Sequence, residues 1–176
     1  GSGYAVGPSR ANPYTGELYD ADIRISADFV RSFYREQTEF IAPILGQVSM
    51  DFESEEPTEE FSSGMCQYGD HLREEMASGW DVMTTTGVLK GTDEELQNYI
   101  HNGLVDLILH EVGHTLGLRH NFKGSSIYSI EQLSDAKFTR KYGISGSVMD
   151  YQPINVFNGE TFFQTKPGTY NYWAIE

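Results

Sequence analysis

One stretch, His-Glu-Val-Gly-His-Thr-Leu-Gly-Leu-Arg-His, constrains this chain more than any other feature. Its first two histidines, His110 and His114, stand one helical turn apart, so both imidazoles leave the same face of a helix and can reach one ion. Gly117 has the backbone freedom to end that helix in a left-handed conformation, after which three residues bring His120 back to the same point. The stretch therefore predicts a helix that ends in a three-histidine metal site.

The donor set favours catalytic zinc. Three neutral imidazoles leave one coordination position open, whereas structural zinc sites are closed by four protein ligands. Glu111 lies about 100° around the helix from His110, close enough to reach a water on the ion without displacing a ligand. We therefore predict that His110, His114 and His120 bind Zn²⁺ and that Glu111 is the catalytic general base.

The other histidines and the single cysteine are not predicted to bind metal. His101 is rotated to the opposite face of the helix and His71 has no partner at ligand spacing, so both are expected to be structural or exposed. Cys66 cannot form an internal disulfide. Nothing near it in the sequence lowers the pKa of its thiol, so a buried thiol is favoured over a nucleophile. Residues 64–79 predict no more than a short helix after Gly69.

Capping patterns place the helices of the C-terminal half. Thr92-Asp93-Glu94-Glu95 is a capping box and predicts the start of the long helix that carries the histidines. Ser129-Ile130-Glu131-Gln132 is a second capping box, and it opens a helix that Gly143 can terminate. The apolar side chains of the long helix share one stripe opposite the imidazoles, which is expected in the core: Val105, Ile108, Leu109, Val112 and Leu116.

The N-terminal part predicts a hairpin followed by a helix. Residues 4–8 are extended in character, residues 12–16 supply turn chemistry, and Leu18 to Ile25 alternates as a half-buried strand does. Apolar residues between Phe29 and Ile44 then fall near helical spacing, and Pro43 marks where that helix should stop.

Composition argues against several classes of function. The formal net charge is -14 and the sequence pI is near 4.6, so the surface repels phosphate backbones and anionic lipids, and nucleic acid is not an expected partner. No apolar run approaches the roughly 20 residues of a membrane span. Residues 51–60 hold six carboxylates without a basic residue, which favours a solvated loop because the spacing matches no calcium-binding loop.

The extended histidine motif resembles that of the metzincin clan of zinc endopeptidases, and a second signature supports the resemblance. Residues 147–151, Ser-Val-Met-Asp-Tyr, follow His120 and resemble the Met-turn of these enzymes, with Met149 as structural support below the imidazoles. Tyr151 matches the tyrosine that astacins and serralysins place near the zinc. Residues 4–8 resemble the edge strand that runs antiparallel to bound substrate in this clan, where unpaired amides and carbonyls can bind any extended peptide.

Further stretches of the sequence, including His-Asn-Phe-Lys-Gly from the third histidine onward, resemble large bacterial secreted zinc-dependent metalloproteases. The resemblance implies an α+β fold with an edge hairpin, a long active-site helix and a Met-turn. It implies one partial catalytic domain over residues 1–176, truncated at both ends. It also implies a secreted or periplasmic location, with any export signal outside this chain.

The implied activity is hydrolysis of peptide bonds in a protein or peptide substrate, with Glu111 as general base and Tyr151 as a hydrogen-bond donor to the oxyanion. Two alternatives stay open. The first is a zinc-bearing but inactive module in which the edge strand still docks peptide. The second is a zinc amidase that acts on a non-peptide amide with the same ligands. No oligomeric state is predicted.

Overall fold

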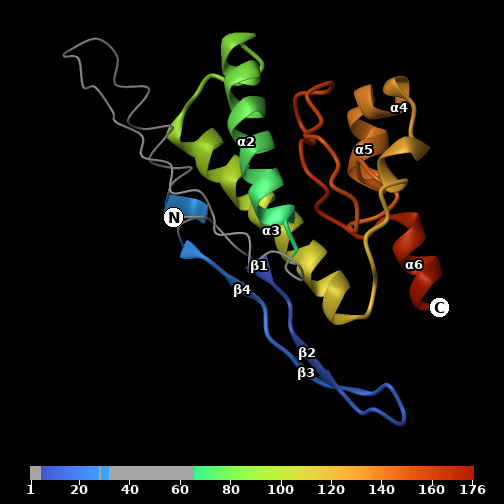
Figure 1. The fold of residues 1–176 in the computed structure, drawn as a ribbon. Coiled ribbons are helices and arrows are strands. Elements are labelled where there is room, and N and C mark those ends of the chain that lie inside the picture. The colour runs from blue at the N-terminus through green and yellow to red at the C-terminus, as the bar shows by residue number, and fades with distance from the viewer. Residues whose placement is uncertain (1–4, 28, 32–65) are drawn as a thin grey trace.

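The computed structural model describes residues 5–27, 29–31 and 66–176. They form two long helices, two short antiparallel strand pairs and a group of short C-terminal helices (Figure 1). The predicted α+β class is therefore confirmed. Residues 27 and 29–31 are helical where a helix was expected to begin. The rest of that expected helix and the acidic loop at residues 51–60 lie outside the described residues.

The N-terminal strands form one extended hairpin, as predicted. The inner pair is β1 (Ala5–Val6) with β4 (Arg24–Ile25), and the outer pair is β2 (Ser9–Ala11) with β3 (Leu18–Ala21). The predicted turn at residues 12–16 closes the outer pair, where the Gly16 amide donates to the Asn12 carbonyl at 2.8 Å.

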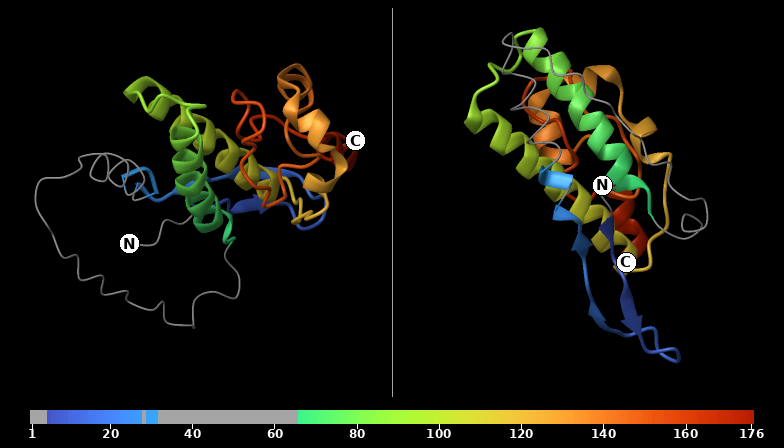
Figure 2. Two further views of the ribbon diagram at one scale, coloured as in Figure 1. Left: turned by 90° about the horizontal axis from the view of Figure 1, so that it is seen from above. Right: turned by 60° about the vertical axis from the view of Figure 1, so that its left-hand side comes forward.

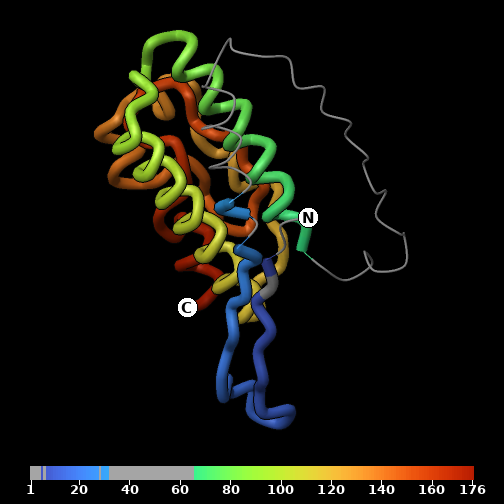
Figure 3. Tube along the Cα trace, turned by 90° about the vertical axis from the view of Figure 1, so that its left-hand side faces the viewer, coloured from blue at the N-terminus to red at the C-terminus, as the bar shows by residue number. Residues whose placement is uncertain are grey.

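The outer half of the hairpin projects away from the helices (Figure 3). Every residue of β2 and of β3 is exposed. The prediction of a half-buried strand over Leu18 to Ile25 is therefore wrong for β3, because no described element covers either of its faces. Alternation along a strand shows that its two faces differ in polarity. It does not show whether another element packs on the apolar face and buries it.

The helix α3 (Asp93–Thr115) begins as its capping box predicts. The Thr92 side chain accepts a hydrogen bond from the Glu95 amide at 3.3 Å, and the Glu95 carboxylate accepts one from the Thr92 amide at 3.0 Å. Two amides that the first turn would leave unpaired are thereby satisfied.

The apolar stripe of α3 does not lie in the core, which corrects the sequence-based expectation. Its fully buried side chains lie on another face and include Leu107, His110 and Glu111. The cause is that α2 and the C-terminal segment pack against the imidazole side of the helix. The stripe residues are exposed or only partly buried: Val105, Ile108, Leu109, Val112 and Leu116.

The helix α2 (Tyr68–Thr85) has 18 residues and is much longer than the short helix expected after Gly69. Its apolar residues recur every three or four positions and join the core between α2, α3 and residues 154–163. The Tyr99 hydroxyl on α3 donates to the Met76 carbonyl on α2 at 3.0 Å. The buried side chains of α2 are Tyr68, Leu72, Met76, Trp80 and Met83.

Two short helices, α4 (Ile130–Ser134) and α5 (Ala136–Tyr142), stand where one helix was expected. The predicted capping box at Ser129 is confirmed. Asp135 divides the helices, because its extended backbone ends α4 while its side chain caps α5. Gly143 ends α5 at φ 80°, which confirms the predicted terminator.

The C-terminal elements gather on one side of the α2 and α3 pair (Figures 1 and 2). They include the 3-10 helix η2 (Gly124–Ile127) and the final helix α6 (Thr169–Ile175). Between them, residues 147–150 form a buried turn. Among the described residues, none of the helices combines the length and the apolar character that crossing a membrane requires.

Candidate metal centre

Three imidazoles meet at the C-terminal end of α3. His110 and His114 lie on its last turns, and His120 follows the turn at its end. The Nε2 atoms of His114 and His120 are 3.2 Å apart. The ring centroid of His110 lies 4.9 Å from that of His114 and 5.3 Å from that of His120. The fold therefore brings all three predicted ligands together.

Backbone carbonyls orient two of these rings. His110 donates from Nδ1 to the Val148 carbonyl at 2.7 Å, and His114 donates from Nδ1 to the Leu118 carbonyl at 3.1 Å. These bonds assign the proton of each ring to Nδ1, so that Nε2 presents a lone pair to the centre. Burial lowers the pKa of His110 to about 3 and also lowers the pKa of His120. Both imidazoles are thus kept neutral, as metal ligands must be.

The backbone at Gly117 builds the turn that returns the third imidazole. Gly117 has φ 85°, a left-handed conformation that costs glycine little. The Leu118 amide donates to the Gly113 carbonyl at 3.0 Å, and the Gly117 amide donates to the His114 carbonyl at 2.9 Å, which together form a Schellman motif. The motif positions the Leu118 carbonyl that orients His114 and reverses the chain toward His120.

Cys66 is a site residue that the sequence analysis missed. Its Sγ lies 3.3 Å from His110 Nε2 and 3.6 Å from His120 Nε2. Together with the three imidazoles it forms a group whose ligand atoms all lie within 4.8 Å of one another. Cys66 stands 44 positions before His110, so no spacing rule connects them. Burial raises the pKa of the Cys66 thiol, in line with the expectation that it is not an activated nucleophile.

Three of the separations among these donor atoms are close to those of a zinc site. With Zn–N near 2.05 Å and Zn–S near 2.3 Å, a tetrahedral site places two nitrogens about 3.3 Å apart and a nitrogen and a sulfur about 3.6 Å apart. The separations of 3.2 Å between His114 and His120, and of 3.3 and 3.6 Å from Cys66, follow these lengths. Imidazole nitrogen and cysteine sulfur are also the donor types that zinc prefers.

Glu111 supplies a carboxylate beside this group. Its side chain has no exposed surface, and neither carboxylate oxygen forms a hydrogen bond within the described residues. Burial raises the pKa of Glu111, while the His114 imidazole and the Cys66 thiol lower it in part. A buried polar group without a partner costs roughly 1–3 kcal/mol, so its retention indicates a functional role rather than a structural one.

Tyr151 also lies next to the donor atoms. Its hydroxyl is 3.4 Å from His120 Nε2 and 3.4 Å from Cys66 Sγ, and it accepts a hydrogen bond from the Gln67 amide at 3.2 Å. Burial raises the pKa of Tyr151, so the hydroxyl keeps its proton and can donate it in a hydrogen bond. The structure therefore places the predicted tyrosine at the metal group.

Met149 packs directly against α3 at Gly113. Met149 is fully buried, and a Cβ added to Gly113 would lie 2.2 Å from its Sδ. A side chain at position 113 would therefore have to displace the thioether of Met149 within a closed interior. Met149 thus supports the helix turn between His110 and His114.

Hydrogen bonds from α6 hold the turn that orients His110. Asn171 accepts from the Val148 amide at 3.0 Å and from the Gly168 amide at 2.9 Å, and it donates to the Ser147 hydroxyl at 3.1 Å. The Val148 carbonyl is the acceptor for His110 Nδ1. Asn171 therefore helps to orient the His110 ring indirectly, by holding the backbone of Val148.

A buried carboxyl, Asp106 on α3, forms hydrogen bonds to α2 and to the C-terminal segment next to the site. It accepts hydrogen bonds from the Tyr68 hydroxyl at 2.9 Å, from the Gln152 amide group at 3.2 Å and from the Gln164 amide at 3.0 Å. The Tyr68 ring in turn stacks on the His110 ring with centroids 4.2 Å apart. One side chain therefore links α2, α3 and the C-terminal segment behind His110.

The buried Asp106 carboxyl should make the free energy of unfolding depend on pH. Burial raises the pKa of Asp106 from its ordinary value of 3.8 to about 7. Between these values the folded chain holds a proton that the unfolded chain has lost, so the free energy of unfolding falls as the pH rises from about 4 to 7. We expect the free energy of unfolding to fall by roughly 1–4 kcal/mol across this pH range and to stay level above pH 7.

Urea unfolding of the wild type and of Asp106→Asn, at saturating zinc, measures this component. The stability of the wild type relative to the variant should decrease as the pH rises, because other titrating groups contribute equally to both proteins. A difference that does not change with pH would contradict the prediction.

The two histidines that were not predicted to bind metal stay out of the ligand group. His101 is exposed on α3. His71 is partly buried on α2 and stacks on the Tyr151 ring with centroids 5.6 Å apart. His71 therefore packs behind Tyr151 rather than among the donor atoms.

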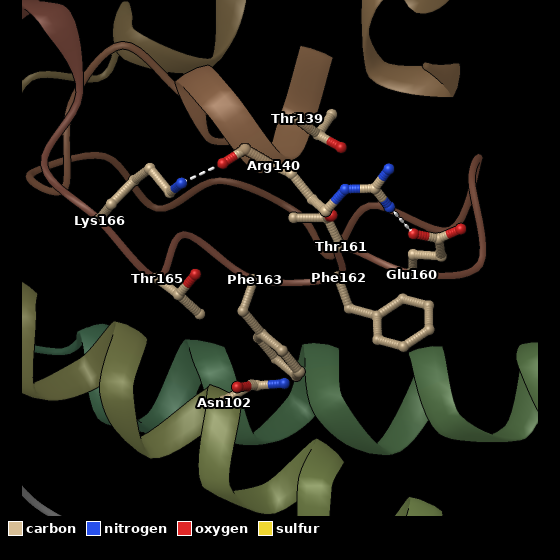
Figure 4. Close-up of a pocket in the computed structure, with 9 residues that line it drawn as sticks. All are labelled: Asn102, Thr139, Arg140, Glu160, Thr161, Phe162, Phe163, Thr165 and Lys166. Atoms are coloured by element: carbon tan, nitrogen blue, oxygen red, sulfur yellow. Dashed lines mark hydrogen bonds and ion pairs between the residues drawn. The ribbon is translucent and has the colours of Figure 1, made fainter. Parts of the chain in front are cut away.

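A second hollow, of about 160 Å³, lies between Asn102 on α3 and residues 160–166 (Figure 4). Its charged side chains already have partners, since Arg140 pairs with Glu160 and the Lys166 ammonium donates to the Arg140 carbonyl. No residue of the metal group lines it. The hollow is thus separate from the metal centre.

The comparisons with known proteins agree with this geometry. Residues 92–176 match a protein-family model described as Met-zincin. Neither the curated proteins nor the solved structures contain a match to the chain. The matched range holds the three histidines, Glu111 and the buried turn at residues 147–150. The metzincin resemblance is therefore confirmed over residues 92–176, which are similar to the Met-zincin family.

Proposed function

We propose that the chain is a zinc-dependent endopeptidase that hydrolyses peptide bonds with a water activated by Glu111. The single observation that carries the proposal is the juxtaposition of three imidazole donors with a fully buried carboxylate that has no hydrogen-bond partner among the described residues. His110, His114 and His120 would hold the ion. Zinc bound to three imidazoles lowers the pKa of water towards roughly 7 and polarises a carbonyl group.

The residues of the chain supply the proton transfers and the charge stabilisation. Glu111 takes a proton from the attacking water through a carboxylate oxygen and then passes it to the nitrogen of the leaving amine. Its raised pKa suits a group that must both accept and return a proton near neutral pH. Tyr151 donates its hydroxyl hydrogen to the oxyanion that develops on the scissile carbonyl.

Two further features of the proposal concern support and substrate. We assign residues 147–151 as a Met-turn, supported by the packing of Met149 under Gly113. We also propose that extended peptide binds along β1. Among the described residues β1 pairs with β4 alone, and the end of this strand lies against α3, where a Cβ at Gly7 would be 2.6 Å from the Glu111 carbonyl. A secreted or periplasmic location is proposed on the sequence resemblance.

The role of Tyr151 makes a prediction about turnover. Tyr151→Phe removes one oxyanion donor and should lower kcat by about 10²-fold with little change in KM. Tyr128→Phe is the matched control, because the Tyr128 hydroxyl bonds the Tyr142 carbonyl at 3.4 Å and no metal-site residue. A Tyr151→Phe variant with unchanged kcat would remove the tyrosine from the mechanism.

A zinc-bearing but inactive peptide-binding module is the second candidate, and one observation favours it. With Cys66 the donor set has four protein ligands, which is the count of a closed structural site. A zinc amidase remains the third candidate, since it would use the same ligands and differ in its substrate.

Digestion of a quenched peptide library by the zinc-loaded chain distinguishes these candidates. The peptidase proposal predicts cleavage of internal peptide bonds, loss of cleavage with a chelator and recovery when zinc is restored. The Cys66→Ala variant is digested in parallel, so that a fourth protein ligand does not mask the activity. Peptide binding without cleavage by either protein would favour the binding module. Hydrolysis of a non-peptide amide substrate, assayed beside the library, without cleavage of any peptide would favour the amidase.

A further inference from the structure

We propose that Phe122 is a specificity-determining residue of the metal centre and that it selects peptides with an aromatic or large aliphatic side chain next to the scissile bond. The inference rests on the proposed function, because it names the substrate class that the same centre would accept. The sequence analysis did not assign Phe122, two positions after His120, to the site.

The Phe122 ring packs against two rings of the metal centre. Its centroid lies 5.4 Å from that of His120 and 5.3 Å from that of Tyr151, and the His120 and Tyr151 centroids are 4.9 Å apart. Phe122 meets Tyr151 edge-on, with an angle of 89° between the ring planes, which is a favourable arrangement for two aromatic side chains. The phenyl ring is therefore held beside a predicted ligand and beside the proposed oxyanion donor.

Phe122 also borders the open side of the centre. His110 and Glu111 are fully buried, whereas His120 is exposed and Phe122 is 62 % exposed. A substrate must approach the centre from the side that solvent reaches. An exposed apolar side chain is common on protein surfaces and carries no conclusion by itself. Phe122 differs because it contacts both a metal ligand and the proposed donor to the oxyanion.

Distance limits which substrate residues Phe122 can touch. An extended peptide advances about 3.3 Å per residue. The 5.3 Å between the Phe122 and Tyr151 rings therefore spans fewer than two residues of such a peptide. With the scissile carbonyl at the Tyr151 hydroxyl, the side chains within reach of Phe122 are those next to the scissile bond.

The chemistry of a phenyl ring sets the preference. An apolar substrate side chain that covers the exposed surface of Phe122 removes apolar surface of both partners from water, and an aromatic side chain adds the attraction between two rings. A carboxylate in the same place would give up water without gaining a hydrogen bond from the ring. Lysine and arginine are the rival class, since the face of an aromatic ring attracts a cation.

Peptide binding to the zinc-loaded Glu111→Gln protein tests this selection without reference to activity. The Cys66→Ala background is used so that a fourth protein ligand does not compete with the peptide. The probes are fluorescent peptides of alanine and serine that differ at one central position, which holds phenylalanine, leucine, glutamate, lysine or serine. Fluorescence anisotropy at saturating zinc should show that the phenylalanine peptide binds about tenfold more tightly than the serine peptide.

Variants of Phe122 attribute the preference to this ring. Phe122→Ala should reduce the difference to less than about twofold, and Phe122→Leu should retain most of it because the side chain stays apolar. Phe157→Ala is the matched control and should leave the difference unchanged. Phe157 is also an exposed phenylalanine, at 54 %, and lies outside the metal group. Zinc content is determined on every sample, so that a lost preference is not confused with lost metal.

The quenched peptide library then relates the preference to cleavage. The Cys66→Ala protein should cleave next to aromatic or large aliphatic residues. Phe122→Ala in this background should lower kcat/KM for those peptides about tenfold, mainly through KM.

Three results would overturn the inference: equal binding of the phenylalanine and serine peptides, a preference for lysine or glutamate, or a preference that survives Phe122→Ala. Selective binding that Phe122→Ala abolishes, without cleavage of any peptide, would support the selection by Phe122 and overturn the peptidase proposal. Cleavage without the expected preference would overturn the inference and leave the peptidase proposal intact.

Discussion

Replacement of Glu111 by glutamine should reduce peptide hydrolysis by about 10²–10⁴-fold while zinc stays bound. Glutamine has nearly the same shape and cannot take a proton from water, so the loss isolates the role of the base. The side chain lies in a fully buried position beside the imidazoles and is not one of their group of ligand atoms. Zinc affinity should therefore change little.

Rates for Glu111→Gln are to be measured with the same peptide in the wild-type and the Cys66→Ala backgrounds, with zinc content determined on the same samples. Glu94→Gln is the matched control, because Glu94 is an exposed glutamate in the first turn of the same helix. Full hydrolysis by zinc-loaded Glu111→Gln would show that another group takes the proton.

Gly113→Val should destabilise the folded chain by about 1–3 kcal/mol and weaken zinc binding. The new Cβ would meet Met149 Sδ at 2.2 Å in a fully buried place. Replacing a helical glycine by alanine stabilises the helix by up to about 1 kcal/mol through helix propensity. Valine stabilises it less, because its side chain is β-branched. Either His110 and His114 lose their relative position, or the turn at Met149 must move.

Urea unfolding and zinc titration of Gly113→Val provide the measurements. Asn98→Val controls for the β-branched side chain, because Asn98 is exposed on the same helix. In a double-mutant cycle, Met149→Ala should reduce the cost of Gly113→Val, since it removes the atom that clashes. Strict additivity of the two substitutions would contradict the packing argument.

The sequence predicted the metal site better than the core that surrounds it. The histidine spacing, the capping box at Thr92 and the left-handed turn at Gly117 are local patterns, in which each residue acts on neighbours within a few positions. The structure places all of them as expected. Local patterns therefore sufficed for the three imidazoles.

Cys66 and Tyr68 could not be found in this way. They reach His110 from the beginning of α2, across about forty positions of sequence, and contact at such a distance depends on how the helices pack. The only available signal was a cysteine close to two aromatic or titratable residues, Tyr68 and His71, and this is too common to predict a ligand.

The apolar stripe on α3 shows a different limit. Periodicity identifies which side chains share a face, but burial depends on which elements pack there. In the described residues, α2 and the C-terminal segment cover the face with His110, and Ile108 is left 40 % exposed. The same limit explains why the alternating residues of β3 are exposed on both faces.

Zinc binding by the intact chain tests the central claim most directly. Competition with a chromophoric chelator should give one zinc per chain for the wild type. His114→Ala should lose more than about 100-fold in affinity, beyond the 10–100-fold that residues supporting a ligand contribute. His101→Ala should bind as the wild type does, because this histidine is exposed and lies outside the group. A wild type that binds no zinc, or a His114→Ala variant with undiminished affinity, would contradict the account.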